Sequence, residues 1–351
     1  MIDEHIGELQ RTFDQLGFVT RSPQMAPVLL RARKAAEVSD ITVLLEGETG
    51  TGKQVLAQSI HHLDRKRRSF AFVTVHCGTI SESLAESELF GHRRGAYSGA
   101  FSDRKGLFQA AQDGTLLLDD VNDLPLSLQA KLLDVIQRGT VRPVGCDQET
   151  RVNVRIIAAA NQPLEPLVHT GRFRADLYHR LNVIRLSLLP LRSRNEDLNS
   201  LILALALRHR SLYGPIEEVD ATLLDFLATQ PFPGNIRELE NAVQRMLFLK
   251  TAGHSFSLED WMAQSQAEST RPLPADLLAN AAKATWVAIS QRGVSWDGAF
   301  QEIERRVLEA AIQADGCTRR EIAERLQTTE RTLYHKMRAY GLSRPTHPAV
   351  G

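Results

Sequence analysis

Along residues 41–189, short apolar runs alternate with stretches in which apolar residues recur at helical spacing. Helical patterns are clearest over residues 54–63 and 124–138. Strands that alternate with helices indicate an α/β fold, in which a parallel sheet carries helices on both faces. The apolar runs predict β-strands at residues 41–46, 70–77, 114–120, 154–160 and 183–189.

Outside this region the pattern changes. Residues 1–20 have the character of a short amphipathic lead-in, and residues 195–262 show helical spacing throughout, which predicts a small lid. Residues 263–298 are polar and irregular, as linkers are, and the remainder is helical again. We therefore expect a lead-in at 1–20, an α/β core at 21–191, a helical lid at 192–264, a linker at 265–298 and an all-α domain at 299–351.

Charge is informative only locally. A chain of 351 residues suits two or three domains, and its 42 basic and 42 acidic residues cancel. Residues 318–344, however, carry seven Lys or Arg residues against three Glu residues. Basic charge concentrated at one end indicates a polyanion as the partner there.

Cysteine usage and hydropathy indicate the cellular compartment of the protein. The 3 cysteines are far apart in sequence and show no metal-binding spacing, and their odd number argues against a disulfide framework. The N-terminus opens with acidic residues and lacks the apolar core of a signal peptide. The longest apolar run, near residues 201–207, is too short to span a bilayer. We expect a cytoplasmic protein without a membrane partner.

A phosphate-binding loop is predicted where an apolar strand is followed by G-x-x-x-x-G-K and a helix. Backbone N–H groups of such a loop face phosphates, and the helix N-terminus adds positive potential. The alternative is an ordinary glycine-rich turn before a helix, and the usual Ser or Thr after the lysine is absent. We expect ATP to be bound by Gly47, Glu48, Thr49, Gly50, Thr51, Gly52, Lys53 and Gln54.

A second motif is the pair of acids that ends the apolar strand predicted at residues 114–120. Asp119 and Asp120 stand where the first acid helps to hold Mg²⁺ and the second activates water. Two acids after a strand also occur as a helix cap or a solvated turn, but the phosphate-binding loop upstream favours catalysis. Asp119 is therefore the expected Mg²⁺ ligand, and both acids are expected to be catalytic.

Several blocks together resemble the bacterial enhancer-binding proteins, which are the AAA+ activators of sigma-54 RNA polymerase. The resemblance runs from about residue 20 to 249 and resumes in the C-terminal helices. Its blocks are GETGTGK (47–53), ESELFGH (86–92), GAYSGA (95–100), LDD (118–120), LQAKLLDVIQRG (128–139), GRFRADLYHRLNV (171–183), PLRSR (190–194) and PGNIRELEN (233–241).

The resemblance implies a role for the loop at residues 95–100, which in the family contacts sigma-54. The family form is Gly-Ala-Phe-Thr-Gly-Ala, so Tyr97 keeps an aromatic ring and Ser98 keeps a hydroxyl. Alone, the motif could be an ordinary flexible turn. The implied contact residues are Gly95, Ala96, Tyr97, Ser98, Gly99 and Ala100.

The resemblance also assigns nucleotide-sensing residues. Arg174 and Arg180 match arginine fingers, which reach into the nucleotide site of a neighbouring subunit. Both could instead be solvated helix charges. Asn161 matches the polar residue that senses the γ-phosphate, and Arg237 matches the sensor arginine of the lid. A ring, expected to be a hexamer, is implied.

Three departures from the family pattern surround the hydrolysis step. Asp120 replaces a glutamate, and His76 replaces an asparagine that in the family holds this glutamate away from water. Ala160 replaces a threonine beside Asn161. We expect His76 to bind Asp120 as a switch, with hydrolysis slow but real.

The C-terminal pattern predicts a helix-turn-helix over residues 319–325 and 330–340, with a compact apolar set that includes Leu333 and Met337. The expected DNA-contacting residues are Arg331, His335 and Arg338. A basic helical pair that only packs on the ring is the alternative. The apolar stripe of residues 300–312 suits a dimer on DNA.

Together these features predict an ATPase that binds upstream DNA, forms a ring and remodels the sigma-54 closed complex. Few residues precede the ATPase region, so we expect regulation by a partner protein, by expression level or by oligomerisation. The rival function is a DNA-binding regulator that uses ATP only for assembly, with little hydrolysis and no sigma-54 contact. A remodelling motor of another AAA+ class is disfavoured by the 95–100 loop and the helix-turn-helix.

Overall fold

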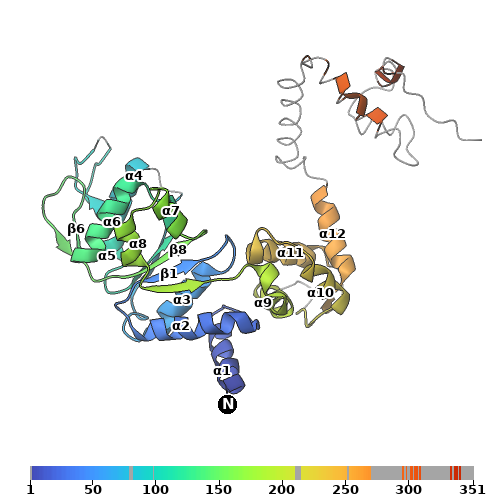
Figure 1. Ribbon diagram of the computed structural model, residues 1–351, viewed down its shortest axis with the longest axis horizontal. Helices are drawn as coiled ribbons and strands as arrows, with labels where there is room; N and C mark the ends of the chain where they lie inside the picture. The colour runs from blue at the N-terminus through green and yellow to red at the C-terminus, as the bar shows by residue number, and fades with distance from the viewer. Residues whose placement is uncertain are drawn as a thin grey trace, which may run out of the picture. The chain divides into compact units, whose positions relative to one another are not determined.

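The computed structural model describes residues 2–78, 82–97, 99–209, 215–250 and 253–269, together with a few positions between 295 and 340. The chain divides into two compact units, Met1–Gln266 and Ala267–Gly351, which are treated separately below. Figure 1 shows the first unit as an α/β layer followed by a helical layer.

A five-stranded parallel sheet forms the centre of the first unit, as the alternating pattern predicts. Its strand order is β2-β5-β8-β1-β9, and each strand coincides with one of the five apolar runs. The bounds are Val43–Glu46 for β1, Phe72–His76 for β2, Thr115–Asp119 for β5, Arg155–Ala160 for β8 and Ile184–Ser187 for β9.

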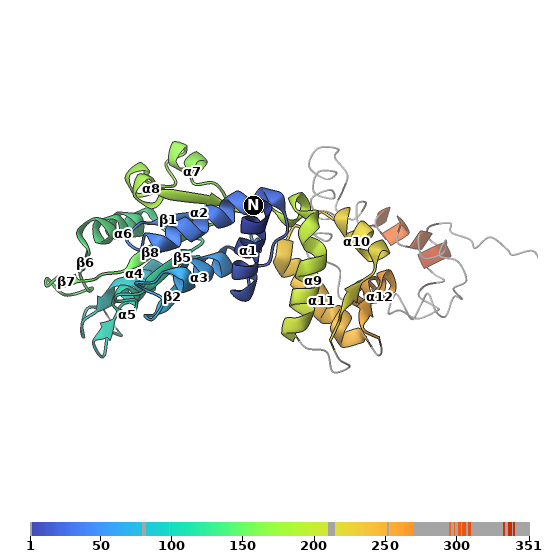
Figure 2. The same cartoon turned by 90° about the horizontal axis from the view of Figure 1, so that it is seen from below.

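Helices cover both faces of this sheet (Figure 2). On one face lie α1 (Ile2–Gln15), α2 (Ala26–Glu37) and α3 (Lys53–Leu63). On the other lie α4 (Glu82–Phe90), α5 (Leu107–Ala110), α6 (Leu126–Arg138), α7 (Glu165–His169) and α8 (Ala175–Leu181). Because side chains alternate along a strand, Leu116 and Leu118 enter the core on the α6 face, whereas Leu117 enters the core on the α3 face.

The N-terminal segment is more than a lead-in. Leu9, Phe13 and Phe18 are buried in the same core as α2 and α3, and the rings of Phe13 and Phe18 pack edge to face at 6.4 Å. The amphipathic pattern of residues 1–20 therefore marks a helix that belongs to the α/β layer.

Two short hairpins and several 3-10 turns lie between these helices and strands. The hairpins pair β3 (Gly91–His92) with β4 (Arg104–Lys105) and β6 (Thr140–Val141) with β7 (Thr150–Arg151). The 3-10 turns are Pro23–Met25, Val121–Asp123, Leu191–Ser193 and Asn195–Asp197.

The lid has its own core between α9 (Leu198–His209), α10 (Ala221–Ala228) and α11 (Asn235–Leu249). The purely helical expectation for this region was wrong, because β10 (Glu218–Val219) pairs with β11 (Ser255–Phe256). Two-residue strands are too short to show an alternating pattern. The final helix of the unit, α12 (Leu258–Ser269), continues past residue 264.

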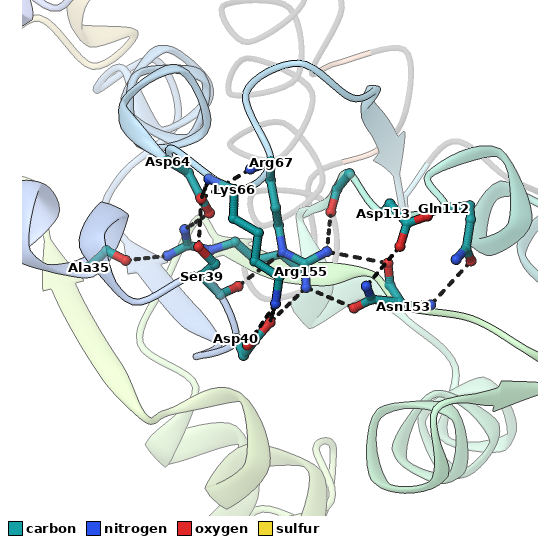
Figure 3. Close-up of polar contacts among 11 residues, drawn as sticks. Ala35, Ser39, Asp40, Asp64, Lys66, Arg67, Gln112, Asp113, Asn153 and Arg155 are labelled. Atoms are coloured by element: carbon teal, nitrogen blue, oxygen red, sulfur yellow. Dashed lines mark hydrogen bonds and ion pairs between the residues drawn. The ribbon is translucent and has the colours of Figure 1, made fainter.

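A buried charge network closes the amino-terminal edge of the sheet (Figure 3). Arg155 at the start of β8 forms an ion pair with Asp64 at 2.6 Å, and both side chains are 0% exposed. Arg155 also donates to the carbonyl of Ala35. Arg67 donates to the carbonyl of Gly114 and to Asn153. These bonds tie the ends of α2 and α3 to the starts of β5 and β8.

Candidate functional site

A cleft of about 220 Å³ lies at the carboxyl edge of the sheet, between the α/β layer and the lid. Its floor includes Lys53 and the two acids Asp119 and Asp120, and the lid contributes Arg237. Open α/β sheets bind ligands at this edge. The structure thus brings the predicted loop, the two acids and the lid arginine to one cavity. Of the predicted loop residues, Thr49, Gly50, Gly52, Lys53 and Gln54 line it.

The predicted phosphate-binding loop joins β1 to α3, which begins at Lys53. Lys53 is 6% exposed, and its ammonium donates to the carbonyls of Gly47 at 2.7 Å and Glu48 at 3.0 Å. Burial lowers the pKa of Lys53 below its usual value, although the nearby Asp120 and Asp119 carboxylates act to raise it. The lysine is thus a buried cation at the base of the cleft.

Asp119 ends β5, and the Nδ1 atom of His76 lies 3.1 Å from its Oδ2 atom. The sheet register explains this contact, because parallel pairing of β2 with β5 sets His76 directly beside Asp119. The expected partner of His76 was Asp120, so the contact found with Asp119 differs from the expected switch geometry. The His76 side chain is 52% exposed.

Asp120 is oriented by Asn161. The backbone of Asp120 is left-handed, with φ of 51°, and the Asn161 Nδ2 atom donates to its Oδ1 atom at 3.1 Å. Asn161 is in turn held by its backbone N–H, which donates to Asn122 Oδ1 at 3.2 Å. The predicted sensor residue and the second acid therefore form one hydrogen-bonded unit. Asn122 was missed by sequence reasoning.

The other end of the cleft is mainly apolar. Phe18 and Val19 approach from the N-terminal segment, and Leu201 and Leu205 approach from α9. An apolar slot next to a phosphate-binding loop suits a purine base. The sequence pattern did not identify these residues, because they are far from the loop in the sequence and have ordinary core character.

Arg174 and Arg180 lie outside the cleft of their own chain. Arg174 precedes α8 and forms a bidentate ion pair with Asp176, with bonds of 3.0 Å and 2.7 Å. This bond raises the pKa of Arg174. Arg180 lines a separate cavity near the amino ends of β1 and β8. Both side chains are exposed.

The loop at residues 95–100 is closed by hydrogen bonds from Gly95 N–H to Ala100 O at 2.8 Å and from Ala100 N–H to Tyr97 O at 3.0 Å. Gly95 and Gly99 have φ of 84° and 116°, which an L side chain rarely adopts. The Tyr97 ring packs on His92 at 5.2 Å and is 38% exposed. Ala96 also lies in this turn, whereas Ser98 is outside the described residues.

The second unit is described at a few positions. Leu333 and Met337, which we expected in the apolar set of the helix-turn-helix, are 1% and 5% exposed. Arg338 is exposed. Glu304 contacts Lys336 and accepts a 2.6 Å bond from the Tyr340 hydroxyl. Arg331 and His335 lie outside the described residues.

Three family descriptions cover most of the chain. Residues 18–187 match the Sigma-54 interaction domain, residues 192–276 match the AAA+ ATPase lid domain, and residues 299–340 match the bacterial regulatory protein, Fis family. The regulatory protein AtoC of Escherichia coli strain K12 is 35% identical over 340 residues, which are 96% of this chain and 71% of AtoC. The transcriptional regulatory protein GlrR of the same strain is 44% identical over 67% of this chain and 52% of GlrR.

Solved structures of a related protein have a similar fold. NtrX from Brucella abortus in complex with ATP has a TM-score of 0.66 at 26% identity, covering 93% of this chain and 69% of NtrX. Its complex with ADP has a TM-score of 0.67 at 27% identity, covering 97% of this chain and 73% of NtrX.

The sheet order, the loop-borne lysine, the paired acids and the helical lid define an AAA+ fold. Within that class, the chain belongs to the sigma-54-dependent transcriptional regulators and carries a DNA-binding helix-turn-helix of the Fis family. In the part of the chain that the structure describes, every helix is too short or too polar to cross a membrane.

Proposed function

We propose that this chain is an ATP-hydrolysing transcription activator that remodels sigma-54 RNA polymerase closed complexes from upstream DNA. The observation that supports this most directly is the cleft at the carboxyl edge of the sheet. It combines a buried lysine, two carboxylates and a lid arginine with an apolar slot. That combination suits a nucleoside triphosphate better than a neutral ligand.

The phosphate end of the cleft would hold ATP through the loop N–H groups and Lys53. Arg237 would approach the outer phosphates from the lid. Asp119 and Asp120 offer the hard oxygen ligands that Mg²⁺ prefers, so the residues present fit Mg²⁺-bound ATP. Bound Mg²⁺ neutralises phosphate charge, and Asp119 is the residue proposed to hold it.

Asp120 is the proposed residue that polarises the attacking water. Its carboxylate is one methylene shorter than a glutamate, and Asn161 fixes one of its oxygens. A displacement of about 1 Å from the optimal position can cost on the order of 100-fold in rate. The proposed hydrolysis is therefore slow. His76, through Asp119, would modulate the same cluster as a switch.

Arg174 and Arg180 are the proposed fingers that complete the site of a neighbouring subunit. Both are exposed and outside their own cleft, which is the placement that a shared site requires. A finger supplies charge to the transferring phosphoryl group and is worth on the order of 10³-fold in rate or more. This arrangement implies a ring, for which we propose a hexamer.

The remaining parts of the chain are the proposed binding sites for partners. We propose that the 95–100 loop, with Tyr97 at its centre, contacts sigma-54. The neighbouring Phe101 is 88% exposed and adds apolar surface for a protein contact. The helix-turn-helix would place Arg331, His335 and Arg338 in the major groove of upstream DNA as a dimer. We also propose that a partner protein regulates this activity.

The rival function, a DNA-binding regulator that uses ATP only to assemble, differs in one measurable way. Shared sites make turnover per subunit rise steeply with protein concentration as rings form. We therefore propose measuring ATP turnover over a wide concentration range. A cooperative rise supports hydrolysis at subunit interfaces, whereas ATP binding with turnover at background at every concentration would favour the rival.

A further inference from the structure

Three consecutive carbonyl groups of the phosphate-binding loop are bonded to the lid or to the segment that leads into it. Thr49 O accepts from Asn235 Nδ2 at 2.9 Å, and Gly50 O accepts from the Ile236 N–H at 2.9 Å. Thr51 O accepts from Arg194 Nη2 at 2.8 Å. Loops of this kind use their N–H groups for phosphate, so the carbonyls must find partners elsewhere.

Asn235 is the centre of this junction. Asn235 is 0% exposed, and its backbone is left-handed with φ of 53°. Its Oδ1 atom accepts the Leu191 N–H at 2.8 Å, while its Nδ2 atom donates to Thr49 O and, at 3.2 Å, to Glu48 Oε2. The amide orientation is fixed chemically, because a flipped amide would set its NH₂ against an N–H and its oxygen against two acceptors.

Glu48 supplies the charged side of the junction. Arg192 binds it with two bonds of 2.7 Å and 2.5 Å. The hydrogen bond from Arg192, followed by that from Asn235, lowers the pKa of Glu48 to about 2. The Glu48 carboxylate is therefore ionised at neutral pH and strongly prefers a donor on Asn235.

The backbones of loop and lid also approach closely here. A side-chain Cβ on Gly50 would lie 2.2 Å from the Gly234 carbonyl oxygen, and the φ of Gly50 is 80°. Asn235 and Ile236 begin α11, and the next residue, Arg237, lines the nucleotide cleft. The position of Arg237 is thus set by how the first turn of α11 is bonded to the loop.

We infer that Asn235 is a positioning residue that ties the lid to the phosphate-binding loop and thereby places Arg237 over the nucleotide. Glu48 is its charged partner. The inference rests on the proposed ATP binding and deepens it, since it names what couples the loop to the lid. When the loop changes shape around phosphate, the first turn of α11 must move with it.

The test is Asn235→Asp in the full chain. The substitution keeps the shape and the acceptor for Leu191 but turns an oxygen toward Thr49 O and the ionised Glu48. We expect ATP to bind about 10- to 100-fold more weakly, as for a buried bond to a charged group that is replaced by repulsion. Hydrogen exchange at the Ile236 amide should accelerate in parallel.

A second substitution distinguishes the loss of the Glu48 contact from a general loss of structure. Adding Glu48→Gln removes the charge and supplies an amide that can donate to the new carboxylate, so the double variant should recover part of the lost affinity and protection. Asn195→Asp is the matched control, because Asn195 donates to Ala228 O within the lid and lies outside the cleft lining. We expect it to change ATP binding less than about twofold.

The outcomes are distinct. Unchanged Ile236 exchange and ATP affinity in Asn235→Asp would overturn the inference, as would a loss that Glu48→Gln does not repair. A wild-type chain that does not bind ATP would instead contradict the proposed function. The Ile236 exchange readout would then still decide whether Asn235 ties the lid to the loop.

Discussion

The buried pair of Asp64 and Arg155 allows a quantitative prediction for stability. In Asp64→Asn, the oxygen would stay with Ser39 and the backbone of Lys66, so the new NH₂ would face the Arg155 guanidinium. Two donors would then meet where the structure has a 2.6 Å ion pair with both side chains 0% exposed. An uncompensated buried charge of this kind costs about 3–5 kcal/mol.

That cost should appear in the unfolding of the first unit. At about 2–4 °C per kcal/mol for domains of this size, the midpoint should fall by about 6–20 °C. Differential scanning calorimetry of the whole chain measures it, with the transition of the first unit followed separately. Asp40→Asn is the matched control, because Asp40 is 68% exposed in the same network and its contribution should not exceed about 1 kcal/mol.

The pH dependence gives an independent check. Burial acts to raise the pKa of Asp64, but bonds from Ser39 and Arg155 outweigh it, so the folded-state pKa lies below the ordinary value. The stabilisation is therefore complete above the unfolded pKa of about 3.9 and is lost as pH falls through the folded pKa. The deficit of Asp64→Asn should be constant from neutral pH to about pH 5 and shrink at lower pH. Equal effects of the Asp64 and Asp40 variants, or a deficit that grows in acid, would refute this reasoning.

Five further substitutions test the nucleotide site and the proposed DNA contact. Lys53→Ala should abolish binding of an ATP analogue in a fluorescence titration, because the buried cation and the loop act together on phosphate; unchanged affinity would contradict the assignment. Arg174→Ala and Arg180→Ala should each lower turnover with little effect on nucleotide binding, and mixing either with Lys53→Ala protein should restore some turnover, unless sites are not shared. Asp120→Glu should raise turnover, since it moves the carboxylate closer to the water; a further loss would remove this residue from the proposed role. Arg338→Ala should weaken DNA binding and reduce its salt dependence in a gel-shift titration; identical binding at every salt concentration would exclude a DNA contact.

The sequence predicts those helices and strands in which the spacing of apolar residues matches the period of the element that forms. Apolar runs of a few residues between helical stretches locate all five sheet strands. The loop motif and the paired acids at the end of β5 are likewise local signals, since each stands in one continuous segment. Their convergence in one cleft follows from the rule that carboxyl ends of parallel strands share an edge.

The features that sequence reasoning missed depend on contacts between distant segments. Arg155 and Asp64 are 91 positions apart, and nothing in their local pattern shows that two charges are buried together. Asn235 was seen only as part of a motif, because its role depends on a left-handed backbone and on Glu48, 187 positions away. The contact of His76 with Asp119 was not expected, because it depends on the register that sets β2 beside β5.

We propose that ATP hydrolysis by this chain activates sigma-54 RNA polymerase. The direct measurement is in vitro transcription from a sigma-54 promoter that carries an upstream site for this protein. Transcript should appear with ATP and be absent both with a non-hydrolysable analogue and with the Tyr97→Ala variant. Transcript of equal yield with the non-hydrolysable analogue, or its absence under every condition in which the protein occupies its DNA site, would contradict the account.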